Sequence, residues 1–455
     1  MAATAGAMTI GLNVDAIAAA GSGMFNPETF VLDNGMQVVV IENHRAPVVS
    51  HWVWYKVGTA DSPLGKSGLP HFVEHLMFKG TETVAPGDFS KIVARHGGND
   101  NAMTSADFTA YFQNIARDRL EMAMEMEADR MANLQLREQD VLAERDVVLE
   151  ERRSRVDNQP AALLGEQLNA AQYLNHPYRL PIIGWHHEIE SYDKGDALAF
   201  YDSWYAPNNA VLIVAGAITA DELRPMAERT YGQIPAREVP ERTRLGEPPQ
   251  ILERRIELQH ERVEQPALIR SYLAPSFATA DGGEAYALEV LAELLGSGGT
   301  SRLYRSLVVD QGLAANAGAY YRGSSLDLTT FRVHVSPRQG GDLPTLEAAL
   351  DAEIEKLLEH GVTEAEVERV KQRMIAEAIY ARDSLTTAVR VFGSALTTGS
   401  SIEEVEAWPA RIAAVTTDAV EAVARIVFNR DQSVTGQLVP AKAESDAAAT
   451  DGTTG

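Results

Sequence analysis

Residues 68–81, GLPHFVEHLMFKGT, place two histidines and a glutamate within five positions of an otherwise apolar segment. The segment is expected to form a helix, because Pro70 falls in the first turn, where its missing N–H group costs nothing. On a helix, His71 and His75 lie one turn apart on the same face, and Glu74 lies beside them. Both imidazoles can then reach one metal ion while the carboxylate approaches its bound water, an arrangement typical of metal-dependent hydrolases.

The simpler alternative is an apolar helix that carries two core histidines. For a single histidine this alternative would be favoured. Here two imidazoles and an acid on one face would all need hydrogen-bond partners inside an apolar wall, which makes the alternative costly. We therefore interpret the inverted H-x-x-E-H pattern as a metal-binding motif.

A zinc site of this kind needs a third protein ligand and leaves one position open for water. Candidate ligands lie in the segment VLAERDVVLEERRS, which is expected to be helical. Glu144 and Glu151 are seven residues apart, or two helical turns, so both carboxylates are expected on one face, flanked by Val147 and Val148. Carboxylates set between valines require a cation or a hydrogen-bond donor.

With these residues the chain resembles the pitrilysin family of inverted-zincin metallopeptidases, in the branch that includes mitochondrial processing peptidase. In that family a glutamate ligand follows the H-x-x-E-H motif at a long interval, and Glu151 lies at the matching interval, 76 positions after His75. The resemblance implies that His71, His75 and Glu151 bind one zinc ion per chain. It also implies that Glu74 is the general base and that Glu144 orients a zinc ligand.

Three further segments carry the same resemblance. GGNDNAMTSADFTAYF resembles the family's substrate-binding edge strand, NHPYRLPIIG a family loop, and LLGSGGTSRLYRSL the corresponding segment of the second repeat. The first implies that backbone groups around Asn101 and Ala102 pair with an extended peptide. Backbone recognition favours unfolded peptides over folded proteins, so we expect hydrolysis of short to medium peptides, with basic ones favoured by the acidity of the chain.

The order of strands and helices occurs twice along the chain. FVLDNGMQVVVIEN predicts two strands joined by an Asn-Gly turn, VVSHWVWYKVG a third strand, and residues 115–157, without Pro or Gly, a long helical stretch. An offset of 219 residues sets Thr300 against Thr81 and puts Val290 and Leu294 where the first copy has its histidines. The predicted fold is α+β, with two homologous pitrilysin-like domains, each a mostly antiparallel sheet packed against long helices.

Composition marks the boundaries between these parts. The segment QIPAREVPERTRLGEPPQ is rich in proline and charge, which is typical of a linker, and the last fifteen residues lack core-forming side chains. We therefore predict an N-terminal extension (1–25), a zinc-bearing peptidase domain (26–232), a linker (233–250), a homologous domain without metal (251–440) and a disordered tail (441–455).

The overall composition excludes several classes of partner. The formal charge of -24 opposes binding to nucleic acid, and no apolar run reaches the length of a membrane span. The chain contains no cysteine, so a transition-metal site must use His, Asp or Glu. The N-terminus MAATAGAMTIGLNVDAIAAAGSG carries no Lys or Arg and is a poor signal peptide. We expect a cytoplasmic protein as numbered, or a periplasmic one if a signal peptide was removed upstream.

One feature of the family pattern is missing. The resemblance implies that active members carry an Arg and a Tyr seven residues apart, in a segment like LRxxxGLxY, which hold the substrate and the developing oxyanion. The matching stretch here is LVVDQGLAAN, with Val308 at the Arg position and Ala315 at the Tyr position. The nearest Arg and Tyr residues fall too early or too late in the segment: Arg302, Tyr304, Arg305, Tyr320 and Tyr321.

The missing pair implies that a second, homologous subunit supplies the Arg and Tyr, so that this chain is the zinc-bearing subunit of a heterodimer. A self-sufficient homodimer is the first alternative. A non-catalytic scaffold subunit is the second, although such chains have typically lost the metal motif that this chain retains. A module that only binds metal or carries peptides is the third.

Overall fold

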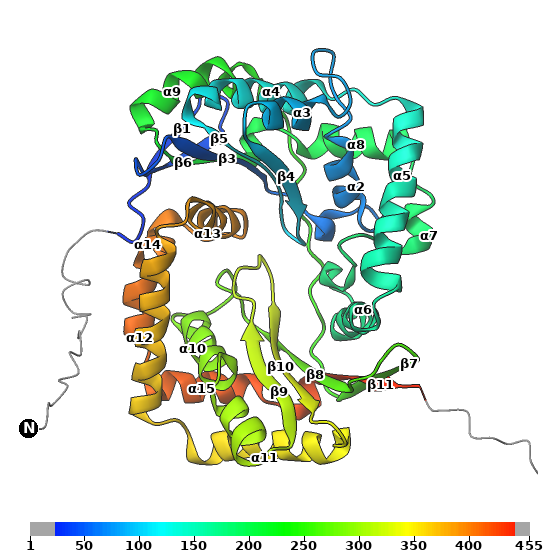
Figure 1. The fold of residues 1–455 in the computed structure, drawn as a ribbon, viewed down its shortest axis with the longest axis vertical. Helices are drawn as coiled ribbons and strands as arrows, with labels where there is room; N and C mark the ends of the chain where they lie inside the picture. Colours follow the sequence, from blue (N-terminus) through cyan, green and yellow to red (C-terminus); the bar gives the residue numbers. More distant parts are fainter. Residues whose placement is uncertain (1–22, 442–455) are drawn as a thin grey trace, which may run out of the picture.

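The computed structural model describes residues 23–441, which form two halves, each built on one β-sheet (Figure 1). The elements of the first half are β1 (Glu28–Val31), β2 (Gln37–Glu42), β3 (Val48–Tyr55), α2 (Leu69–Leu76), α3 (Asp88–Arg95), β4 (Asn99–Thr104), β5 (Thr109–Ala116), α4 (Leu120–Asn133), α5 (Glu138–Arg152), α6 (Pro160–Gln172), α7 (His186–Ile189), α8 (Lys194–Trp204), β6 (Ala210–Gly216) and α9 (Ala220–Arg229). Those of the second half are β7 (Arg254–His260), β8 (Ala267–Ala274), α10 (Glu284–Gly296), β9 (Ala314–Tyr321), β10 (Thr329–Pro337), α11 (Leu343–His360), α12 (Glu364–Ala381), α13 (Leu385–Thr397), α14 (Ile402–Ala413), α15 (Thr417–Val427) and β11 (Ser433–Pro440).

The two sheets have the same strand order. The first runs β1-β2-β6-β3-β5-β4 and the second β7-β11-β8-β10-β9, so the orders coincide once β1 is left out. Each contains one parallel pair, β2 with β6 and β7 with β11, and its other neighbours are antiparallel. Val48, which begins β3, corresponds to Ala267, which begins β8, at the predicted offset of 219. The prediction of two homologous α+β domains is confirmed.

Each sheet is covered on one face by helices of its own half. In the first half, Phe72 and Leu76 of α2 pack in one buried cluster with Val53 and Tyr55 of β3. In the second half, α10, α11, α12 and α15 pack in a corresponding cluster on the other sheet. Burial of this apolar surface fixes α2 rigidly on the sheet, which in turn positions the polar side chains on its opposite face.

The other face of each sheet is covered by a helix from the opposite half. Helix α13 of the second half lies against the first sheet (Figure 1), where Phe392 joins a buried cluster with Trp52 and Trp54. Helix α6 of the first half packs on the second sheet, where Leu164 meets Leu438. The two halves therefore exchange one helix each, and neither sheet is fully covered without the other half.

The prediction of one long helical stretch over residues 115–157 is wrong in its extent. Its first two residues end β5, and the rest is divided into α4 and α5 by an extended segment that begins at Leu134. The Tyr201 hydroxyl accepts a hydrogen bond from the Leu134 N–H (3.3 Å) and lies 2.7 Å from the Met131 carbonyl oxygen, to which it donates. These contacts replace the backbone hydrogen bonds that a continuous helix would make.

The predicted linker contributes partly buried side chains to the first half. Arg242 and Arg244 pair with Asp61 at 3.2 and 3.1 Å, and Arg244 also pairs with Asp107 at 3.1 Å. Asp107 in turn accepts a hydrogen bond from the Leu326 N–H of the second half (3.2 Å). The Gln250 side-chain amide of the linker donates to the Ser433 carbonyl oxygen of the second half (2.7 Å), so the irregular stretch is packed against both halves.

The structure describes only part of the two predicted terminal segments, residues 1–25 and 441–455. Phe25, the last residue of the predicted extension, is buried and lies edge-to-face against Phe392, with ring centroids 5.5 Å apart. The predicted disordered tail lies outside the described residues except for Ala441. None of the helices that the structure describes has the combined length and apolar character needed to cross a bilayer.

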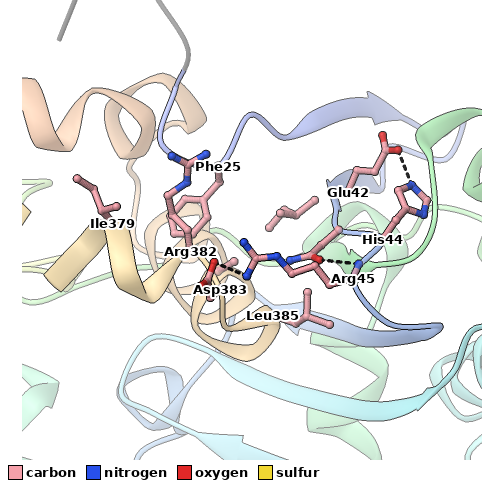
Figure 2. A pocket seen from close by; sticks show the side chains of 11 residues that line it. Phe25, Glu42, His44, Arg45, Ile379, Arg382, Asp383 and Leu385 are labelled. Atoms are coloured by element: carbon pink, nitrogen blue, oxygen red, sulfur yellow. Dashed lines mark hydrogen bonds and ion pairs between the residues drawn. The ribbon is translucent and has the colours of Figure 1, made fainter. Parts of the chain in front are cut away.

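A cavity of about 560 Å³ lies between the two halves (Figure 2). Arg45, which follows β2, reaches across it and pairs with Asp383 between α12 and α13 at 2.5 Å. Both side chains are largely exposed, so the pair contributes little to stability. The cavity contains none of the predicted site residues.

Candidate active site

Helix α2 carries the H-x-x-E-H residues, and the backbone that leads into it is tightly packed at Gly68. Its N-terminal neighbour Gly68 has a left-handed φ of 81°, and a Cβ there would overlap the carbonyl of Ile183. Glycine therefore suits this position on both grounds. His71 and Glu74 on the helix are only 6% and 8% exposed.

Helix α5 brings the distal glutamate to the same place. The Glu151 Oε2 atom lies 3.2 Å from His75 Nε2 and 3.6 Å from His71 Nε2. One ligand atom from each of the three residues lies within 4.8 Å of the others, which makes them the one group of this kind in residues 23–441. Val147, predicted to flank the glutamates, is instead 50% exposed, whereas Val148 is buried.

The spacing of these atoms fits a tetrahedral zinc ion. With zinc–ligand bonds of roughly 2.0–2.1 Å, two ligands of a tetrahedral ion lie about 3.3 Å apart, close to the two Nε2–Oε2 separations in the structure. Glu151 Oε2 is buried and lacks a hydrogen-bond donor. A buried carboxylate oxygen without a donor is costly unless a cation satisfies it. The donor set of two imidazoles and one carboxylate therefore suits zinc.

Glu144 holds His75 from the far side. Its Oε1 atom lies 2.9 Å from His75 Nδ1, and its other oxygen pairs with the ammonium group of Lys79. Burial opposes ionisation, but the bonds from His75 and Lys79 lower the pKa of Glu144. A carboxylate that accepts from Nδ1–H leaves Nε2 free as a metal ligand.

Glu74 is linked to the edge strand of the first sheet. The hydroxyl of Thr104, the last residue of β4, donates to Glu74 Oε2. Burial raises the pKa of Glu74 to about 7, although the Thr104 hydrogen bond opposes this rise. A carboxyl with a pKa near neutrality is suited to accept and return a proton at physiological pH.

When no metal is bound, the pKa values of the two histidines are shifted in opposite directions. Burial and the neighbouring His75 lower the pKa of His71 to about 4. Burial also opposes the charge on His75, but the hydrogen bond with Glu144 and the negative charge of the neighbouring Glu151 raise its pKa to about 9. Metal binding must displace this proton from His75, so the metal affinity is expected to fall at lower pH.

Strand β4 carries the two predicted substrate-binding residues at the edge of the sheet. Asn101 and Ala102 pair with Phe112 and Tyr111 of β5 on one side. Because β4 is the last strand of its sheet, its other side has no strand partner among the described residues. The Ala102 N–H donates to the side-chain oxygen of Asn101 (2.8 Å). An incoming peptide would need to replace this bond.

The second half has no comparable cluster at the matching place. Val290 and Leu294, which the repeat sets against the two histidines, are buried in the second core. Glu293 falls at the position that corresponds to Glu74 and pairs with Arg373 of α12 at 2.7 Å. An ion pair thus stands where the first half has its cluster.

The positions expected to carry the Arg/Tyr pair hold no polar side chain. Val308 packs partly buried against the second core, and Ala315 is exposed on β9. Of the nearby alternatives, Arg302 donates twice to Glu366, at 2.8 and 2.9 Å, and is therefore engaged.

Sequence reasoning missed three residues that contact the cluster: Lys79, Thr104 and Arg155. Arg155 pairs with Glu151 Oε1 at 2.5 Å. It lies four residues after Glu151, and Lys79 lies four residues after His75, so a search for charged neighbours one helical turn away could have found both. The Thr104 contact depends on the placement of β4 beside α2, for which the sequence holds no comparable signal.

Comparison with known proteins places the chain in a family. Residues 37–185 match the family model described as insulinase (peptidase family M16), and residues 191–374 match the model described as peptidase M16 inactive domain. The zinc protease PqqE of Helicobacter pylori is 31% identical over 374 residues, which are 81% of this chain and 83% of that protein. The chain therefore belongs to peptidase family M16, the insulinase and pitrilysin family.

Other relatives agree at lower identity. An uncharacterized zinc protease of Streptomyces coelicolor is 27% identical over 408 residues, covering 89% of this chain and 87% of that protein. The crystal structure of a protease from Helicobacter pylori superposes with a TM-score of 0.85 at 29% identity, covering 91% of this chain and 99% of that one. The resemblance to the pitrilysin family is confirmed, whereas the branch of the processing peptidase stays a prediction.

Proposed function

We propose that this chain is a zinc-dependent endopeptidase of unfolded peptides. His71, His75 and Glu151 would hold one zinc ion, and Glu74 would act as the general base. The observation that carries the proposal is the spacing of the three donor groups, with a buried Glu151 oxygen that lacks a donor. The zinc proteases among the relatives support the choice of metal.

Zinc bound at this site supplies Lewis acidity to the attacking water and to the peptide carbonyl. Glu74 accepts the proton of the water as the water oxygen bonds to the carbonyl carbon, and it returns that proton to the leaving amine when the C–N bond breaks. Glu144 fixes the ring orientation of His75. Thr104 holds one oxygen of Glu74 and so leaves the other oxygen for the proton.

The substrate would lie as an additional strand along the outer edge of β4. Backbone groups of Asn101 and Ala102 are the proposed contacts, and the Thr104–Glu74 hydrogen bond joins this strand directly to the base. This mode of binding requires an extended chain, which favours unfolded peptides.

We further propose that a homologous subunit completes the site, as in the processing-peptidase branch, with this chain as the zinc-bearing partner of a heterodimer. The support is the absence of donor side chains at Val308 and Ala315. The fold is shared with the periplasmic protease PqqL of Escherichia coli: this chain matches 47% of that protein and 92% of the structure of its first half, at 19% and 20% identity.

Hydrolysis of an internally quenched peptide by the purified chain tests the proposal. We expect activity that zinc chelation removes and added zinc restores. Without the Arg/Tyr pair the rate should be lower by roughly a hundred- to a thousandfold than in a mixture with the homologous partner. Equal rates with and without a partner would favour the homodimer. A zinc-loaded chain that is inactive in every mixture would indicate the non-catalytic scaffold.

A further inference from the structure

A second cavity, the α10–α14 pocket, is lined by residues of α10, α12, α13 and α14 of the second half and by Met24 and Phe25 of the first. Its volume is about 610 Å³, within the range of roughly 300–1,000 Å³ that is typical of small-molecule sites. Four aromatic side chains line it: Phe25, Phe277, Tyr286 and Trp408. None of the residues of the His71 cluster takes part, so the pocket is separate from the proposed peptidase site.

Glu289 is the unusual member of this lining. The Trp408 indole N–H donates to its Oε2 atom at 2.8 Å, and the carboxylate makes no ion pair with any residue that the structure describes. Burial raises its pKa to about 7, and the nearby charge of Glu293 adds to this rise. A carboxylate held in an apolar wall by one neutral donor is costly, and a cation would relieve that cost.

The other charged residues of the pocket are directed elsewhere. The Arg390 guanidinium lies over the ring of Trp52, 5.8 Å from its centroid, and Trp52 is not part of the lining. Glu404 accepts a hydrogen bond from the Ser401 N–H (2.8 Å) at the start of α14. Of the three charged lining residues, Glu289 is therefore the one held by another side chain of the lining, that of Trp408.

We infer that the α10–α14 pocket binds a small aromatic amine, with its ring against the aromatic lining and its ammonium group paired with Glu289. A single carboxylate is too few for a metal site, and a neutral apolar ligand would leave Glu289 without a counter-charge. Tyr286 and Trp408 line the same pocket, and the faces of such aromatic rings attract cations. The same chemistry is offered by a free amine and by the amino terminus of a peptide that begins with an aromatic residue.

Calorimetry with three matched probes tests this inference on the full chain. At about pH 8, where Glu289 is largely ionised and an aliphatic amine is protonated, we expect 4-phenylbutylamine to bind at least about tenfold more tightly than 4-phenylbutanol. Phenylbutyrate, with the same length and the opposite charge, should bind most weakly. Phe-Ala-Ala-amide and its N-acetylated form distinguish the two sources, because only the unacetylated peptide offers the required charge.

Two variants locate the effect. Glu289→Gln should make the amine and the alcohol bind equally, while Glu293→Gln, four residues further along α10 and outside the pocket lining, should keep the preference. Val391→Trp, at a pocket residue that is 38% exposed, should block all three probes by filling the space. Equal binding of amine and alcohol by the unmodified chain, no binding of any probe, or a preference that survives Glu289→Gln would each overturn the inference.

Discussion

The two halves of the molecule share one strand order and differ in the side chains on the α-helix that follows β3 in the first half and β8 in the second. In the first half, α2 carries His71, Glu74 and His75, and α5 adds Glu151. In the second half, α10 retains Glu293 at the matching position but pairs it with Arg373 of α12. The comparison shows that the same packed pair of helices can support either a metal cluster or an ion pair. A few side chains, rather than the fold, decide which of the two forms.

The difference between the two halves is tested most sharply by comparing the Glu74→Gln protein with the Glu293→Gln protein. Loss of the proposed general base should lower kcat/KM by roughly 10²–10⁴-fold while zinc stays bound. The matched change in the second half removes an ion pair and should leave the peptidase rate within about twofold, because surface pairs of this kind contribute little. Steady-state kinetics with zinc analysis of both proteins provides the measurement. A zinc-loaded, fully active Glu74→Gln protein would contradict the assignment.

Zinc should stabilise the two halves unequally. At a free zinc concentration of about 100 times Kd, binding stabilises the folded site by about 2.7 kcal/mol. Amide hydrogen exchange should therefore slow in α2 and near the end of α5, and change little in α10. The Glu151→Gln protein serves as the control and should show no slowing in α2. Equal protection of α2 and α10 would mean that the metal does not act at the proposed cluster.

Each of the two exchanged helices, α6 and α13, contains one glycine, and the two glycines have different surroundings. A Cβ at Gly393 of α13 would overlap the buried Trp54 ring, whereas one at Gly165 of α6 would meet nothing within 4 Å. Gly393→Ala should lower the free energy of unfolding by about 1–3 kcal/mol through overpacking. Gly165→Ala should raise it by about 0.5–1 kcal/mol, since alanine favours the helix. Urea unfolding measures both free energies. A similar effect at the two sites would show that α13 does not pack closely against Trp54.

A smaller effect concerns the partly buried carboxyl of Glu289 in the second half. The pKa of Glu289, like that of Glu74, is raised to about 7, so the folded state binds this proton more tightly than the unfolded state does. Stability is therefore lost as pH rises from the ordinary value of 4.5 towards 7. Glu289→Gln should change little near pH 4 and stabilise the protein above pH 7, on the order of 1–2 kcal/mol.

Glu366 provides a control of opposite sign for this pH dependence. Hydrogen bonds from Arg302 lower its pKa to about 2, so its contribution to stability is present above the ordinary value of 4.5 and is lost as pH falls through 2. Glu366→Gln should therefore destabilise the protein at neutral pH and have no effect below pH 2. Urea unfolding of both variants across this pH range checks the two signs, and the same sign for both would contradict the burial of Glu289.

Much of the fold could be predicted because the repeat is visible in the sequence. The offset that aligns Thr81 with Thr300 also aligns β3 with β8, residue for residue. The exchange of α6 and α13 could not be predicted, because an apolar helix face does not specify which sheet it covers. The break between α4 and α5 was missed because it depends on the Tyr201 hydroxyl, a contact from far along the chain.

The candidate site was predictable to the extent that its residues follow helical spacing. His71 and His75 are one turn apart, and Glu144 and Glu151 are two turns apart, so each pair faces one way. The contacts between helix and strand, such as Thr104 with Glu74, arise only when β4 is placed beside α2. The ion pair between Lys79 and Glu144 likewise joins two separate segments, although the position of Lys79 was within reach of a spacing argument.

The zinc content and zinc K-edge absorption spectrum of the purified chain test the central claim most directly. The account predicts one zinc per chain, with two imidazole nitrogens at roughly 2.0–2.1 Å and the remaining ligands oxygen. Both imidazole signals should be lost together with the metal in a protein that carries His71→Ala and His75→Ala. A chain that binds no zinc at micromolar concentration, or a spectrum without imidazole in the first coordination shell, would contradict the account.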